Sequence, residues 1–155
     1  MKQERGVTLV EMMIVVAIAG TMVSLVLPVF SNGLENLRLS QASDSVAAFI
    51  NGALNRAERR QQAMEVTISP RENLILLRSA DGAFSRQLDL PEGITISGTL
   101  PKPPGDPADV RGFLLLPGGT PPRIGVQLVN RRGRQSIVSV DPITGVPRIE
   151  RPEMP

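Results

Sequence analysis

The first thirty residues carry an almost unbroken run of apolar side chains. Between Val7 and Phe30 the only ionisable residue is Glu11. A helix of about 24 residues is long enough to cross the roughly 30 Å of hydrocarbon in a lipid bilayer. Lys2 and Arg5 precede the run, and cations before a span favour a cytoplasmic N-terminus. The pattern therefore predicts one membrane-spanning helix, with the rest of the chain on the opposite side of the membrane.

The spacing of apolar residues changes after that run. From about Leu34 to Met64 they recur every three or four positions, which predicts an amphipathic helix with one buried stripe. The stripe consists of Val46, Phe49, Ile50, Ala53, Leu54 and Ala57.

After Glu65, apolar and polar residues alternate in short segments, which is typical of β-strands separated by turns. About seven strands are expected, with hairpins at residues 66–78 and 124–140. Residues 101–107, PKPPGDP, are too rich in Pro for regular structure and predict an exposed loop. The expected fold class is α+β. A long N-terminal helix, membrane-spanning in its first half and amphipathic in its second, packs on an antiparallel β-sheet or β-sandwich.

The composition excludes several classes of function. The chain has no Cys and no His, so it has no disulfide or thiolate nucleophile and lacks the usual ligands of transition metals. Its 4 Phe residues are its only aromatic residues, too few for a base-stacking surface. Asp106 and Asp109, in the Pro-rich loop, are weak evidence for a calcium site. We therefore expect no enzymatic activity, no cofactor and no metal.

The apolar run has three possible roles, and they differ in how they account for Glu11. A carboxylate in an apolar helix costs several kcal/mol unless it is paired. One interpretation is a secretory signal peptide cut near Ala19, and a second is a plain membrane anchor that tolerates Glu11. In a third, Glu11 meets a cation that arrives on assembly. Cleavage after Gly6 would create such a cation, a free amino terminus four residues before Glu11.

The short basic leader ending in Gly6, the Glu at position 11 and the apolar run resemble the type IV prepilin family. The resemblance implies that a prepilin peptidase cuts between Gly6 and Val7 and that Val7 is then N-methylated. It also implies that Glu11 aligns each subunit with its neighbour in a filament. Pro28 lies where many family members carry a helix-bending Pro, whereas Val7 stands where Phe or Met is more usual.

The order of elements after the apolar run is similar to that of H-class pseudopilins and FimT-type minor pilins. This likeness implies a minor pilin or pseudopilin, a structural subunit of a type II secretion pseudopilus or a type IV pilus. Its partners would be other pilin or pseudopilin subunits, the prepilin peptidase and the lipid bilayer. It would be anchored in the inner membrane with a periplasmic C-terminal domain, and would enter a filament on assembly.

DNA uptake is an alternative function, because some FimT-type pilins bind duplex DNA through arginines. The candidate contacts here are Arg131, Arg132, Arg134 and Arg148. Guanidinium groups fit phosphate geometry, but solubility also accounts for arginines on a surface. The Gly-Arg-x-Arg motif of that family is incomplete in the turn from Gly145 to Arg148, where the first Arg is missing. DNA is therefore the less favoured partner.

These patterns divide the chain into four parts. Residues 1–6 are a leader, and residues 7–30 are a transmembrane and assembly helix. Residues 31–64 continue as an amphipathic helix into the globular domain, and residues 65–155 form an antiparallel β domain.

Overall fold

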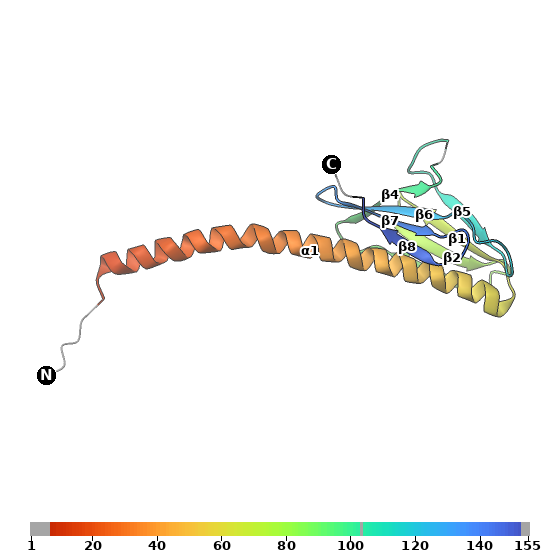
Figure 1. The fold of residues 1–155 in the computed structure, drawn as a ribbon, viewed down its shortest axis with the longest axis horizontal. Coiled ribbons are helices and arrows are strands. Elements are labelled where there is room, and N and C mark those ends of the chain that lie inside the picture. The colour runs from red at the N-terminus through yellow and green to blue at the C-terminus, as the bar shows by residue number, and fades with distance from the viewer. Residues whose placement is uncertain (1–6, 103, 153–155) are drawn as a thin grey trace. The chain divides into compact units, whose positions relative to one another are not determined.

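The computed structural model describes residues 7–102 and 104–152, except for the side chains of residues 24–32. The chain forms two compact units, residues 1–34 and residues 35–155. Helix α1 (Leu9–Arg60) contributes residues to both units. In Figure 1 the strands of the second unit lie along the C-terminal part of this helix.

From Leu9 onward the first unit is helical, and most of its described side chains are apolar. The large apolar side chains described between Val7 and Val23 are all more than half exposed. Among the described residues, no helix combines the length and the apolar character that a membrane crossing requires. The span expected over residues 7–30 extends into side chains that lie outside the described set, as does the side chain of Pro28.

Helix α1 ends at Arg60, four residues before the expected end at Met64. The amide of Gln62 donates to the carbonyl of Ala57, and the amide of Gln61 donates to that of Glu58. Gln61 itself has a left-handed φ of 50°. These bonds form a Schellman cap, usually made with Gly, which stops the helix. Met64 instead begins a strand and is fully buried there.

The described part of the chain contains eight strands in two four-stranded sheets. Sheet A has the order β3-β2-β1-β5 and sheet B the order β4-β6-β7-β8. Sheet A contains β1 (Met64–Ser69), β2 (Leu74–Ser79), β3 (Ser85–Asp89) and β5 (Arg111–Leu115). Sheet B contains β4 (Ile94–Leu100), β6 (Gly125–Asn130), β7 (Gln135–Val140) and β8 (Pro147–Glu150). All pairings are antiparallel, and both expected hairpins are present as β1–β2 and β6–β7.

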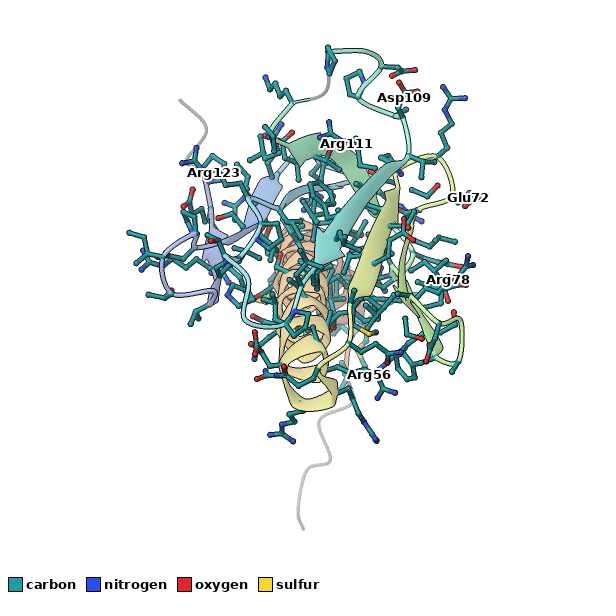
Figure 2. The ribbon with its side chains drawn as sticks, turned by 90° about the vertical axis from the view of Figure 1, so that its right-hand side faces the viewer. Arg56, Glu72, Arg78, Asp109, Arg111 and Arg123 are labelled. Atoms are coloured by element: carbon teal, nitrogen blue, oxygen red, sulfur yellow. The ribbon has the colours of Figure 1, made fainter. Side chains whose placement is uncertain are left out.

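The stripe of α1 packs between the two sheets, as the α+β expectation requires. Val46, Ile50 and Ala53 are fully buried, together with residues of both sheets such as Val66 and Val138. In Figure 2 the yellow-green strands of sheet A and the blue strands of sheet B lie on either side of α1. All the buried core residues lie between Leu39 and Val140, so the second unit contains the whole core.

Two stacked pairs of side chains join α1 to the edge of sheet A. The guanidinium carbon of Arg56, on α1, lies 3.4 Å from the ring centre of Phe84. In the reverse direction, Arg86 of β3 lies 5.8 Å from the ring centre of Phe49 on α1. In such cation–π contacts the guanidinium itself is attracted to the electron-rich face of the ring.

Asn73 joins the two sheets at the turn between β1 and β2. Its side-chain amide donates to the carbonyl of Ile94 at 2.8 Å, and its side-chain oxygen accepts from the amide of Ile96 at 2.9 Å. Asn73 also has a left-handed φ of 56°, a conformation that Asn tolerates better than most residues. One side chain therefore closes the turn and holds the edge of β4.

Asn73→Ala should lower the free energy of unfolding by about 2–4 kcal/mol, because it removes both hydrogen bonds and strains the turn. Asn73→Gly keeps the left-handed backbone and should cost about 1 kcal/mol less. Urea unfolding of a fragment comprising residues 35–155 measures both variants. Equal losses for Ala and Gly would show that backbone strain contributes nothing at this turn.

Candidate assembly segment and basic surface

Glu11 lies in the first turn of α1, where the helix start is capped by Thr8. The hydroxyl of Thr8 accepts from the amide of Glu11 at 3.2 Å, and the carbonyl of Thr8 accepts from the amide of Met12. Thr8 and Glu11 thus occupy the two positions of a capping box, the residue before the helix and its third residue. The partial positive charge at a helix N-terminus favours a carboxylate there.

Apart from Thr8, the described side chains near Glu11 are apolar. Leu9, Val10, Met12 and Ile14 are each more than half exposed, and they follow one another around the helix. A helix that is apolar all round is stable only when other apolar matter covers it. This segment therefore requires lipid or other helices around it.

The expected cleavage site can be located only on its C-terminal side. Val7 lies before the first residue of α1 and is 64% exposed. Gly6 lies outside the described residues. Cleavage between Gly6 and Val7 and methylation of Val7 remain predictions.

Three of the four candidate arginines lie together on the turn between β6 and β7. The side-chain oxygen of buried Asn130 accepts from the amides of Arg132 and Arg134, at 3.0 and 2.9 Å. Gly133 has a φ of 80°, which permits the tight turn. The side chain of Arg131 packs over Gly93, where an added Cβ would lie 3.1 Å from its Nε. Asn130, which the sequence analysis did not single out, therefore holds the basic turn in shape.

Arg148 lies apart from that turn, near the start of β8. Its guanidinium is 2.7 Å from a carboxylate oxygen of Asp141. The amides of Ile143 and Thr144 donate to Asp141 at 2.8 and 3.1 Å, and these bonds lower the pKa of its carboxyl. Desolvation raises the pKa of Asp141, but by less than either amide lowers it. The charge of Arg148 lowers this pKa by a still smaller amount. The structure thus brings Arg131, Arg132 and Arg134 together and gives Arg148 a separate partner.

A groove of about 590 Å³ lies between the basic turn and the start of α1 in the second unit. It is lined by Asn36, Leu39, Ser40, Arg134, Gln135, Ser136, Arg151 and Pro152. Arg151 donates to the hydroxyl of Ser40 at 2.8 Å, and the buried hydroxyls of Ser43 and Ser136 are hydrogen-bonded at 2.8 Å. The sequence analysis did not single out Arg151, because nothing in its local pattern reveals the distant Ser40.

The acids of the Pro-rich loop already have a cationic partner. Arg71 lies 3.2 Å from Asp106 and 3.7 Å from Asp109. Over the described residues, no group of three or more acidic side chains is arranged to hold a metal ion.

Asp141→Asn should destabilise the second unit at neutral pH, because the ionised carboxylate is favoured by two amides and by Arg148. The folded pKa of Asp141 is below its ordinary value of 3.8, so this contribution is present above that pH and is lost as pH falls through the folded pKa. The difference in unfolding free energy between wild type and Asp141→Asn should therefore shrink below about pH 4. Arg148→Gln is the matched control. It should keep most of the pH dependence, because the two amides lower the pKa of Asp141 more than Arg148 does. A difference that stays constant from pH 7 to pH 2 would contradict this account.

Comparisons with known proteins found similarities to the N-terminal segment and to the fold. Residues 1–27 match the family model of the prokaryotic N-terminal methylation motif. No curated protein matches the chain significantly. The fold is similar to that of the minor pseudopilin EpsH from the type 2 secretion system of Vibrio cholerae, with a TM-score of 0.58 and 15% sequence identity. The match covers 76% of this chain and 99% of EpsH. The family model thus covers the N-terminal segment alone, and the likeness to EpsH shows that the two chains share a fold.

Proposed function

We propose that this chain is a structural, non-catalytic subunit of a type II secretion pseudopilus or a type IV pilus. The observation that carries the proposal is the N-terminal methylation motif joined to a helix that is apolar on all its described faces. Such a helix needs a cover, and a filament of parallel helices supplies one. The fold likeness to EpsH favours the pseudopilus.

Processing precedes assembly in this proposal. Residues 1–6 act as a leader that a prepilin peptidase removes, and the new terminus at Val7 is methylated. Support comes from the match of the methylation motif and from Val7, which is exposed and precedes the first turn of α1. An exposed, non-helical peptide is accessible to a peptidase.

Residues 7–30 then hold the subunit in the inner membrane, with the C-terminal domain in the periplasm. On assembly, the amine of Val7 in one subunit pairs with Glu11 of the next. In a medium of low dielectric constant, an ion pair is several times stronger than the ~1 kcal/mol it contributes in water at 4 Å. The described apolar residues that surround Glu11 provide such a medium once helices pack together.

The first test is the mass of the N-terminus in mature protein isolated from its native host. We expect a chain that begins at Val7 and carries one methyl group on its amine. Processing should fail in a strain that lacks prepilin peptidase, which serves as the control. A chain that keeps residues 1–6 in its working form, or that begins at Gly20, would overturn the proposal.

The second test separates the charge of Glu11 from its role in capping the helix. Glu11→Gln keeps a residue that suits the third position of a capping box but removes the charge. We expect incorporation into filaments to fall at least about tenfold, because the ion pair outside water is lost. Glu92→Gln, an exposed acid in a turn of the second unit, is the matched control and should have no effect.

Both variants are measured in sheared filament fractions, with membrane insertion measured in parallel. Normal incorporation of Glu11→Gln would mean that Glu11 serves the helix start alone.

A further inference from the structure

The groove beside Ser40 has two cationic groups, and none of the described residues that line it is acidic. Arg134 enters it from the β6–β7 turn and Arg151 from the segment after β8. Neither arginine is paired with a carboxylate among the described residues. Glu35, just before the groove in the sequence, is paired with Arg38 at 3.6 Å. The groove therefore presents two guanidinium groups whose charge no described carboxylate neutralises.

The rest of the lining favours an anion with oxygen atoms. Asn36, Ser40 and Gln135 add polar groups, and buried Leu39 provides an apolar wall. Guanidinium groups bind phosphate oxygens in pairs of hydrogen bonds, which makes arginine better suited to phosphate than lysine. A space of about 590 Å³ is far larger than the ~30 Å³ of one water molecule. It has room for a phosphate together with the small polar group attached to it.

The first residue that lines this groove follows the apolar run closely in the sequence. Asn36 comes six residues after Phe30, the last residue of that run. Leu37 is 54% exposed and lies only three residues before Ser40. Leu37 thus gives the second unit an exposed apolar side chain within one helical turn of Ser40. Basic side chains at such a position reach toward lipid phosphates with their flexible stems.

We propose that the groove formed by Ser40, Arg134 and Arg151 binds the phosphate of an anionic phospholipid headgroup at the periplasmic face of the inner membrane. The proposal rests on the membrane insertion stated under Proposed function. The bound lipid would hold the second unit against the membrane surface before assembly. Phosphate is the chemistry that the groove recognises, and the short stretch of sequence between the apolar run and Asn36 favours a lipid as its source.

Duplex DNA fits these observations less well. Of the four arginines expected to contact DNA, Arg148 is paired with Asp141, so only the short β6–β7 turn presents a cluster. DNA therefore enters the test as a competing outcome.

The test uses the full chain in neutral detergent, titrated with dihexanoyl-phosphatidylglycerol or with zwitterionic dihexanoyl-phosphatidylcholine. Binding is followed through the backbone amide signals of residues 40, 134–136 and 151. We expect saturable shifts with the anionic lipid and an affinity at least about tenfold higher than for the zwitterionic one, because two cations face the site. Arg134→Gln together with Arg151→Gln should weaken anionic-lipid binding at least about tenfold.

Two further variants complete the design. Arg78→Gln with Arg123→Gln removes the same charge from two exposed positions on opposite sides of the unit, and should leave binding unchanged (Figure 2). Arg134→Lys with Arg151→Lys restores the charge and should recover part of the affinity. All four substituted residues are exposed, and the spectrum of each variant confirms its fold.

Three results would overturn the proposal. The first is an unchanged lipid affinity in Arg134→Gln with Arg151→Gln. The second is inorganic phosphate binding as tightly as the anionic lipid, which would make the source free phosphate. The third is salt-sensitive binding of duplex DNA through the same arginines without any preference for the anionic lipid.

Failure of this inference and failure of the proposed function are distinguishable. The short-chain lipids are soluble, so the titration does not depend on insertion of the apolar segment. An unprocessed N-terminus with a lipid-selective groove would refute the filament subunit alone, and a mature N-methylated chain without lipid selectivity would refute the groove alone.

Discussion

Helix α1 encounters two environments along its length, and the rest of the molecule follows from how it meets them. Its first described part is apolar on every face, whereas from Leu39 onward only one stripe is apolar and buried. Neither sheet has another apolar helix to cover it, among the described residues, so Val46, Ile50 and Ala53 must supply the shared core. Truncation of a buried Ile such as Ile50 to Ala costs about 2–5 kcal/mol in proteins generally, a large share of the stability of a domain this size.

Packing of this stripe also fixes which turns of sheet B lie beside which part of the helix. The β6–β7 turn lies beside Asn36 and Ser40, where the second unit begins, and shares a groove with them. The β7–β8 turn lies beside Asn51 and Asn55, further along the helix, where Thr144 and Gly145 line a second hollow. Strand β7 separates the two turns, so the basic residues on one cannot act together with Arg148 near the other. The four arginines expected to contact DNA therefore lie in two separate places, three on the β6–β7 turn and Arg148 on β8.

The features that the sequence predicted are those that depend on local periodicity. The stripe from Val46 to Ala57 has the spacing of a helix, and the hairpins have alternating strands around polar turns, so both were found and are confirmed. The helix end was missed by four residues because Gln61 takes the left-handed role usually filled by Gly. Asn73, Asn130 and the groove at Arg151 were missed because each depends on partners brought close by the fold. A polar residue in a turn has the same local pattern whether or not it joins two sheets.

Glu11 is subject to two physical demands that act at the same helix end. As the third residue of α1, it lies where the helix dipole favours a carboxylate, so part of its cost in an apolar setting is offset within its own chain. A free amine at Val7 would lie at that same end, where the dipole disfavours a cation. The amine then gains most from a carboxylate, and the apolar side chains around Glu11 make any such pair stronger than it would be in water. If the chain is cleaved after Gly6, as proposed, the helix start disfavours the new amine and favours an acid, so the amine would be stabilised by the Glu11 carboxylate of a neighbouring subunit.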